Sequence, residues 1–327
     1  MRLDQPFLKL PIRFDADALA ADVRALPEAA WVPHPTGFKG NEAVRLVSVG
    51  GGANDDFNGE MAATEQLLAS RYVMQVMDAI GGVWGRSRLM GLGPGGDVPQ
   101  HVDTHYYWRT HWRIHVPIVT NPAVTFSCGP ETVHMAAGEC WLFDSFRWHK
   151  VQNGGDAQRI HLVLDTVGGP RFWDLVEEAK SGRAEERLVA PAPASAAPPE
   201  LVFERINLTP VMSPWQLRTH VAFLAERSVP HPVLAALLGR LERFVDDWTV
   251  AWAQHGSERS GWPTYMTLLD GLKTDLSTLR GGGDVLLTNR LPFYAALDNM
   301  IFLALFADPA EVSAYVAAPP QRQRAAS

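Results

Sequence analysis

The chain has 327 residues, of which 46% are hydrophobic and 20% charged, and its formal net charge is −7. This composition is ordinary for a soluble globular protein with a sizeable core. The absence of a dense Lys/Arg block in the sequence argues against a nucleic-acid-binding surface, which would need many phosphate contacts. The first twenty residues lack the apolar segment of a signal peptide, and no apolar run approaches about 18 residues. Two cysteines, Cys128 and Cys140, are too few for a disulfide scaffold. We therefore expect a cytoplasmic protein with buried free thiols.

The first eighty residues alternate between strand and helix patterns. A strand is predicted at Phe7–Leu10 and a second at Ala43–Val49, where a run of glycines ends it. Apolar residues at helical spacing predict a helix over Asp15–Leu26. A single longer amphipathic helix is predicted over Thr64–Ile80, ended by Gly81 and Gly82.

From Val83 to about Val167 the sequence changes to short β-rich runs separated by turn residues. The clearest runs are Arg88–Leu92, Arg113–Ile118, Val124–Cys128, Cys140–Asp144, Trp148–Val151 and Arg159–Leu164. Several short strands at this spacing favour a sandwich or jelly roll over a sheet built from βαβ units.

The rest of the chain predicts a linker and a helical domain. After a short helix at Asp174–Ser181, residues 190–199 consist almost entirely of Ala and Pro, a composition typical of a semi-rigid linker. Helices are expected at four places, namely 214–227, 233–254, 264–279 and 292–306, and a polar tail from Gln321. We therefore divide the chain into a β-rich domain at 1–183, a linker at 184–200 and a helical domain at 201–327.

His101 and Asp103 form a candidate metal-binding pair. In a β-strand the side chains at positions i and i+2 point to the same face, so both residues can converge on one point. His149, on another predicted strand, would supply a third ligand. Two imidazoles and one carboxylate on one face of a metal are typical of non-haem Fe(II) oxygenases, because this set leaves positions open for a co-substrate and O2. The alternative is three polar residues on the surface of a β-domain.

Arg159, ten residues after His149, is a candidate partner for an anion. A dicarboxylate co-substrate that binds iron through one end leaves its other carboxylate inside the barrel, where an unpaired charge is costly. A guanidinium group can pair with that carboxylate through two hydrogen bonds. If the two strands form a hairpin, His149 and Arg159 share a face only when the loop has an odd number of residues, such as 153–155 or 152–156. The alternative is an ordinary cross-strand charge.

Four further residues are candidates for the same site. Arg113 and His115 face the same way on one predicted strand and could bind a carboxylate of the co-substrate or the substrate. An exposed pair on an edge strand explains them equally well. His134 precedes a predicted turn and could line the pocket or cap the turn. Asp144 could orient a ligand histidine or end its strand.

The order of these motifs resembles the aspartyl/asparaginyl β-hydroxylase family. The resemblance covers about residues 83–168 and rests on the following segments: Gly91–Gly95, His101–Asp103, Arg113–Pro117, His134–Asp144, His149, Asn153 and Arg159–Val163. Bacterial proline hydroxylases, which are Fe(II)/2-oxoglutarate dioxygenases of the double-stranded β-helix fold, are close relatives of this family. The resemblance implies that His101, Asp103 and His149 bind iron and that Arg159 holds the distal carboxylate of 2-oxoglutarate. Arg113 and His115 look like the pair that helps to hold the co-substrate.

The resulting expectation is an α+β protein with a double-stranded β-helix core (a jelly roll, cupin-like), N-terminal helices and a helical C-terminal domain. By the resemblance, residues 1–183 are a dioxygenase domain that uses Fe(II), 2-oxoglutarate and O2. The presence of Asp103, which the animal peptide aspartyl hydroxylases lack, favours the amino-acid and proline hydroxylase side of the resemblance. The expected substrate is an amino acid (free, proline-like) or an amino-acid residue, hydroxylated at an unactivated C–H bond with release of succinate and CO2.

Two alternatives stay open. One is a peptide or protein hydroxylase that uses the helical domain for docking, and the other is a non-catalytic cupin-like metal-binding module. The expected partner is an amino acid or a peptide, with no nucleic acid and no membrane. A homodimer is a further expectation for the apolar faces of the C-terminal helices.

Overall fold

The computed structural model describes residues 3–35, 37–193 and 195–317. The chain divides into two compact units, which are described separately here. The first contains the residues up to Asp103 together with Trp108–Asn207, and the second contains Thr104–Tyr107 and the residues from Leu208 onward. The tail expected from Gln321 lies outside the described residues. Within the described ranges, no helix is long and apolar enough to cross a membrane.

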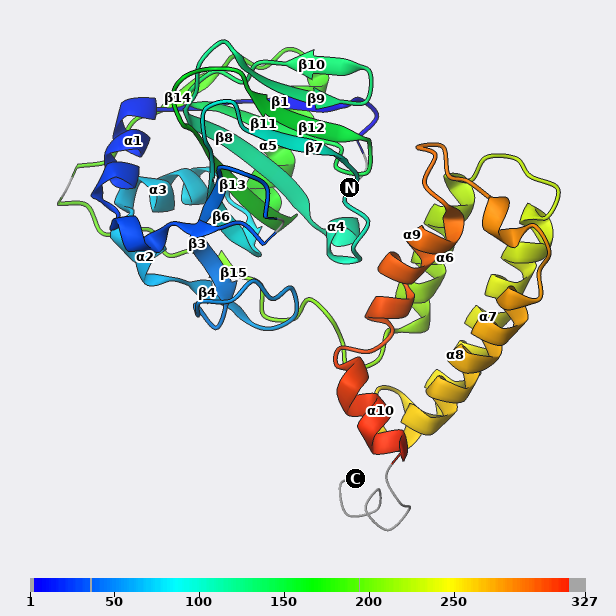
Figure 1. The fold of residues 1–327 in the computed structure, drawn as a ribbon. Helices are drawn as coiled ribbons and strands as arrows, with labels where there is room; N and C mark the ends of the chain where they lie inside the picture. The colour runs from blue at the N-terminus through cyan, green and yellow to red at the C-terminus, as the bar shows by residue number, and fades with distance from the viewer. Residues whose placement is uncertain (1–2, 36, 194, 318–327) are drawn as a thin grey trace. The chain divides into compact units, whose positions relative to one another are not determined.

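The first unit is built on two β-sheets (Figure 1). The large sheet contains, in order, β14 (Arg187–Val189), β1 (Phe7–Phe14), β11 (Glu139–Phe143), β8 (Trp112–Val119), β13 (Arg159–Gly168), β6 (Ser87–Leu92), β3 (Asn41–Val49) and β2 (Val32–Pro33). Three short strands extend it: β4 (Met61–Ala63) pairs with β3, β5 (Val83–Trp84) pairs with β13, and β15 (Val202–Phe203) pairs with β5. The small sheet contains β10 (Glu131–Val133), β9 (Val124–Cys128), β12 (His149–Asn153) and β7 (Asp97–His101). The predicted double-stranded β-helix core is confirmed.

The central strands of the large sheet alternate strictly between two environments. On β13, Ile160, Leu162 and Leu164 are buried in the main hydrophobic core. Because successive side chains of a strand point to opposite faces, Arg159 and His161 lie on the other face with Val163 and Asp165. β8 repeats the pattern, with Ile114, Val116 and Ile118 in the core. One face of the sheet therefore carries the core, and the other carries chemically active side chains.

Three helices cover the core face of the large sheet: α1 (Ala16–Ala25), α3 (Arg71–Ile80) and α5 (Pro170–Ser181) (Figure 1). The side chain of Asp15 caps the first of them by accepting a hydrogen bond from the Ala18 amide. The single helix predicted over Thr64–Ile80 is wrong in one respect. It is divided at Ser70, whose φ of −99° and ψ of 81° are not helical, into α2 (Glu65–Ala69) and α3.

Two short strands fall close to the expected domain limits. β14, inside the expected linker, pairs in parallel with β1, and β15, beyond the linker, pairs in parallel with β5. Glu204, directly after β15, is 5% exposed, and its Oε2 lies 3.0 Å from Nε2 of His111. The chain from 184 to 207 thus contributes strands and a buried carboxylate to the first unit. The limits at 183 and 200 stay predictions.

The second unit is helical. Its elements are α6 (Pro214–Glu226), α7 (Leu234–His255), α8 (Trp262–Ser277), α9 (Phe293–Met300), α10 (Pro309–Ala317) and the 3₁₀ turns at Arg259–Gly261, Gly282–Asp284 and Phe302–Ala304. A capping box of Ser213 and Gln216 starts α6. Trp248 is fully buried, with ring centroids of Tyr265 and Phe306 at 4.5 and 6.0 Å. The helix α4 (Tyr107–Thr110) precedes β8 in the chain.

Candidate active site

The first unit contains a cavity of about 490 Å³, a size typical of small-molecule sites. Its walls come from the inward face of the large sheet, from the small sheet, and from loop residues that include His34, Pro35, Phe38, Asp55 and Phe57. Polar residues of the wall are His34, Asn41, Asp55, Arg86, Arg88, His101, Asp103, Arg113, His115, His149, Arg159 and Asp165. The active-site candidates of the sequence, except His134 and Asp144, therefore lie on one cavity.

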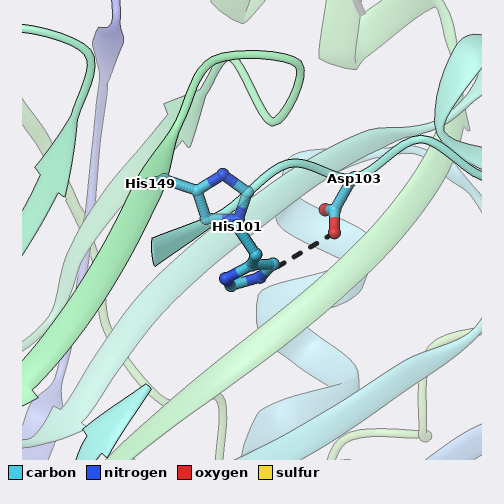
Figure 2. A group of neighbouring side chains, drawn as sticks. All are labelled: His101, Asp103 and His149. Carbon is cyan, nitrogen blue, oxygen red and sulfur yellow. Dashed lines mark ion pairs between the residues drawn. The ribbon is translucent and has the colours of Figure 1, made fainter. Parts of the chain in front are cut away.

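His101, Asp103 and His149 converge at this cavity, as Figure 2 shows. His101 ends β7 and is the register partner of His149 on β12, so their ring centroids are 4.2 Å apart. Asp103 lies two residues beyond the end of the strand, where its amide donates to the carbonyl of Ser145 at 3.0 Å. One ligand atom of each residue lies within 4.8 Å of the others. The structure thus brings His101 and Asp103 together, as the i, i+2 argument expected, although only His101 belongs to the strand.

Backbone carbonyls determine which nitrogen of each histidine faces the site. Nδ1 of His101 lies 2.8 Å from the carbonyl of Pro99, and Nδ1 of His149 lies 2.9 Å from that of Arg147. A carbonyl only accepts hydrogen bonds, so each Nδ1 carries the proton and each Nε2 keeps its lone pair. This is the outer hydrogen bond that orients metal-binding histidines. Burial lowers the pKa of His149 to about 4, which keeps its ring neutral and able to bind a metal.

Asp103 completes a donor set that fits ferrous iron. Its Oδ2 is buried and, within the described part of the chain, accepts no hydrogen bond. The nearest cation is Arg113, whose Nη1 lies 3.5 Å away. Leaving a buried carboxylate oxygen without a hydrogen bond costs free energy, and a divalent cation held by Asp103, His101 and His149 would reduce that cost. Two neutral imidazoles and one carboxylate are the ligands that non-haem Fe(II) selects.

Arg159 begins β13 and is 5% exposed. Among the described residues, nothing accepts a hydrogen bond from its Nε or Nη2. Burial lowers the pKa of the guanidinium to about 9, which expresses the cost of keeping this charge away from water. His115, across the sheet on β8, has a buried Nε2 that also lacks a partner in the described structure. Both side chains line the cavity and can donate to an anion.

The hairpin argument for Arg159 was wrong in its premise. β12 and β13 belong to different sheets, since β12 pairs with β7 and β9 whereas β13 pairs with β6, β8 and β5. Residues 154–158 cross from one sheet to the other. His149 and Arg159 line the same cavity because the two sheets face each other, and no hairpin register applies.

Arg113 is not on an edge strand. β8 lies between β11 and β13, and the guanidinium of Arg113 binds the carboxylate of Asp165 on β13 through Nε and Nη2 at 3.0 and 3.2 Å. The two residues are register partners across the sheet. This bidentate pair holds Arg113 beside Asp103, so its cation faces the metal ligands rather than solvent.

Two other candidates have structural roles. His134 was predicted to contact the co-substrate, but it is exposed and does not line the cavity, and its Nδ1 bonds to the carbonyl of Val124 at 2.9 Å. The physical reason is that β10 ends at Val133, and the next side chain turns outward. Asp144 does not orient a ligand histidine. It accepts hydrogen bonds from the Phe146 amide and the Arg147 side chain, and so shapes the turn before His149.

The sequence reasoning missed several cavity residues. Asp165 could have been found by continuing the i, i+2 pattern from Arg159 along β13. The same pattern finds His161, which does not line the cavity but is 2% exposed and whose Nδ1 lies 3.4 Å from Nδ1 of His115. Arg88 faces the cavity by the alternation of β6. Asp55 lies in a loop, where no periodic signal exists.

Parts of this chain resemble proteins of known structure. No curated protein matches it. Solved structures that resemble it include an oxidoreductase of the 2OG-Fe(II) oxygenase family from Burkholderia pseudomallei, with 12% identity over 48% of this chain and 80% of that chain at a TM-score of 0.37. A prolyl-4-hydroxylase from Pseudomonas putida has 15% identity over 50% and 93% at a TM-score of 0.35. A predicted oxalate decarboxylase from Thermotoga maritima has 18% identity over 42% and 89% at 0.26.

A family model matches part of the chain. Residues 46–168 match the model described as aspartyl/asparaginyl beta-hydroxylase. This segment contains His101, Asp103, His149 and Arg159, and it contains every strand of the small sheet. The match confirms the predicted class of enzyme, a 2-oxoglutarate-dependent hydroxylase that uses Fe(II) and O2. Residues 46–168 of this chain are therefore similar to the aspartyl/asparaginyl beta-hydroxylase family.

Proposed function

We propose that this protein hydroxylates an unactivated C–H bond of an amino acid, free or within a peptide, with His101, Asp103 and His149 as the iron ligands. The observation that carries the proposal is that His101, Asp103 and His149 each place a ligand atom within 4.8 Å of the others. The Nδ1 atoms of both histidines are already bonded to backbone carbonyls, so their Nε2 atoms can bind a metal. When bound, iron and 2-oxoglutarate supply the oxidising chemistry, in which one oxygen atom of O2 enters the substrate and the other enters succinate as CO2 leaves.

The protein's own residues position the co-substrate. In the proposal, Arg159 binds the distal carboxylate of 2-oxoglutarate through its two unsatisfied donors, Nε and Nη2. His115 donates its Nε2 proton to the same group. Its pKa lies well below the ordinary value, first because it is buried and then because Arg159 is near, so the ring is neutral. Its Nδ1 faces that of His161, and a neutral His115 that accepts at Nδ1 carries its proton at Nε2.

The remaining wall excludes water and orients the ligands. Phe126 and Phe143 lie with ring centroids 5.3 Å from that of His115, and Phe143 lies 4.9 Å from His149. These rings separate the metal end of the cavity from bulk water, which strengthens charge–charge interactions inside it. The Arg113–Asp165 pair fixes a cation beside Asp103.

The test is a turnover assay with matched binding measurements. The protein is loaded anaerobically with Fe(II) and 2-oxoglutarate, amino acids and short peptides are added, and O2 is then admitted. A product with the mass of one added oxygen atom, formed together with succinate, is the expected result. Metal binding without any succinate in the presence or absence of substrates would refute the proposal and favour a non-catalytic metal-binding module.

A further inference from the structure

His161 is a buried, titratable side chain that the proposed function leaves without a role of its own. It lies on the inward face of β13, but it is only 2% exposed and does not line the cavity. Burial, followed by the charge of Arg159, lowers its pKa well below the ordinary value, so its ring is neutral. Within the described chain, its Nε2 has no hydrogen-bond partner. A leucine at this position would avoid the cost of that unsatisfied nitrogen, so core packing does not account for the histidine.

The register of the sheet places His161 next to His115. β8 and β13 are antiparallel neighbours, and His115 lies opposite Val163, two residues after His161. The two histidines are therefore diagonal neighbours on one face, a spacing that long side chains can bridge. Their Nδ1 atoms are 3.4 Å apart, and their ring planes meet at 77° with centroids 5.6 Å apart. One Nδ1 donates a hydrogen bond and the other accepts it.

A hydrogen bond between two neutral imidazoles allows two arrangements of the protons. In the first, His161 donates from Nδ1, so His115 carries its proton at Nε2. In the second, His115 donates from Nδ1, so its Nε2 has only a lone pair and His161 carries a proton at Nε2. The second arrangement leaves that N–H of His161 buried without an acceptor among the described residues. Only the first arrangement offers the cavity a donor.

An anion in the cavity selects the first arrangement. Arg159 lies two residues before His161 on the same face of β13, and its charge is the second cause, after burial, of the lowered pKa of His115. A carboxylate that pairs with Nε and Nη2 of Arg159 therefore comes close to His115. A carboxylate repels a lone pair and accepts from an N–H group. Its binding thus favours the state in which His161 donates.

Packing prevents His115 from turning its other nitrogen to the cavity. The rings of Phe126 and Phe143 lie edge-on to the imidazole, at 90° and 82°. Both phenylalanines are buried in the hydrophobic cluster that β9 and β11 share. A half-turn of the imidazole would also move its Nδ1 away from His161 and break the bond between the two histidines.

We infer that His161 is a positioning residue for the co-substrate: by donating from its Nδ1 to Nδ1 of His115, it keeps the Nε2 proton of His115 directed at the distal carboxylate of 2-oxoglutarate. This inference rests on the proposed function and deepens it, because it adds a residue outside the cavity to the binding machinery. His161 contacts neither the metal ligands nor the cavity, and it acts through His115 alone. Its unsatisfied Nε2 is then a local loss of stability that accompanies function.

The first experiment measures the dissociation constant of 2-oxoglutarate by anaerobic calorimetry on the full-length protein loaded with Fe(II). His161→Leu should weaken binding roughly 3- to 10-fold, as for the loss of a neutral hydrogen bond. His161→Asn, whose amide N–H can take the place of the Nδ1 proton, should recover most of the affinity. In a His115→Phe background, His161→Leu should change the dissociation constant by no more than about 2-fold, because the group through which it acts is gone.

A second experiment reads the protons directly on the unaltered chain. Nitrogen-15 NMR of labelled histidines distinguishes a protonated from an unprotonated ring nitrogen, with diamagnetic Zn(II) in place of Fe(II) and 2-oxoglutarate at saturation. We expect His161 to carry its proton at Nδ1 and His115 to carry its proton at Nε2. A histidine that only fills space would not fix this pattern.

The outcomes separate this inference from the proposed function. Failure of the native, metal-loaded protein to bind 2-oxoglutarate would refute the proposed function. If the native protein and His161→Leu bind 2-oxoglutarate equally well, the proposed function stands and the positioning role is refuted. The role is also overturned if His161→Leu causes the same loss in the His115→Phe background, if His161→Asn binds as weakly as His161→Leu, or if His161 carries its proton at Nε2 in the complex.

Discussion

Replacing Arg159 by Met tests the co-substrate site most directly. The substitution removes the charge and both unsatisfied donors from a residue that is 5% exposed, and it keeps most of the side-chain volume. Losing one partner of a buried charge pair costs about 2–5 kcal/mol. The dissociation constant of 2-oxoglutarate should therefore rise roughly 30- to 5,000-fold. Iron affinity should hardly change, because Arg159 is not part of the metal-binding group.

Thermal unfolding distinguishes a lost binding site from a damaged fold. At a 2-oxoglutarate concentration of 100 times its dissociation constant, the metal-loaded protein gains about 2.7 kcal/mol of stability. If the affinity falls by about 100-fold, the same concentration adds only about 0.4 kcal/mol. For a unit of this size the first gain corresponds to a rise in Tm of about 5–10 °C, and the second to about 1 °C. Without 2-oxoglutarate the variant should be no less stable, because the native guanidinium is buried without hydrogen bonds at Nε and Nη2.

Two controls accompany this substitution. Arg159→Lys keeps a charge but not the planar pair of donors, so its affinity should fall between those of the native protein and Arg159→Met. Arg205→Ala removes an arginine whose side chain is 80% exposed and should leave 2-oxoglutarate binding unchanged. An Arg159→Met variant with native affinity for 2-oxoglutarate would show that the distal carboxylate binds elsewhere, and the reasoning from the orphaned donors would be refuted.

Three further predictions concern the metal, pH and chain length. His101→Ala and His149→Ala should each abolish stoichiometric Fe(II) binding in anaerobic calorimetry, whereas His134→Ala, outside the cavity, should bind normally; native binding by either ligand variant would contradict the assignment. Burial holds the pKa of His161 well below 6.5. As the pH falls, this histidine therefore binds a proton in the unfolded chain before it does so in the folded protein. The free energy of unfolding should fall below about pH 6.5, by up to about 1.4 kcal/mol per pH unit for this histidine. In urea titrations from pH 7 to 5, His161→Leu should show a shallower decline, and equal slopes would exclude His161 as a cause. A chain truncated after Pro191 loses β15 and Glu204, the partner of His111. Its first unit should therefore be about 1–3 kcal/mol less stable than the first unit of a chain truncated after Asn207. Equal urea midpoints for the two chains would show that residues 192–207 contribute nothing to stability.

The neighbouring pair of candidate metal ligands could be predicted from the sequence because a short-range rule brings the two side chains together. Asp103 follows His101 by two residues, and His101 is the last residue of β7. Arg113 and His115 share the inward face of β8 for the same reason of period two. The helix limits were also close to prediction where a capping residue exists, as at Asp15 and Ser213.

Features that depend on long-range packing could not be read from the sequence. The order of strands in two sheets places Arg159 opposite the small sheet, and a hairpin between neighbouring strands was the simpler but wrong assumption. The interruption at Ser70 has no Gly or Pro to signal it. Asp55 meets Arg88 and Arg45 only because a loop folds back against β3 and β6, and nothing periodic marks such a contact.

The two-faced character of β13 limits how this protein can evolve. One inserted or deleted residue near the start of the strand would exchange its faces, so that Arg159, His161 and Asp165 would enter the helix-covered core while Ile160, Leu162 and Leu164 would face the cavity. Three polar groups buried without partners would cost about 1–3 kcal/mol each or more, against a typical total stability of about 5–15 kcal/mol. Descendants of this sequence should therefore diverge in substrate preference by single substitutions on the inward face, while the length of β13 stays constant.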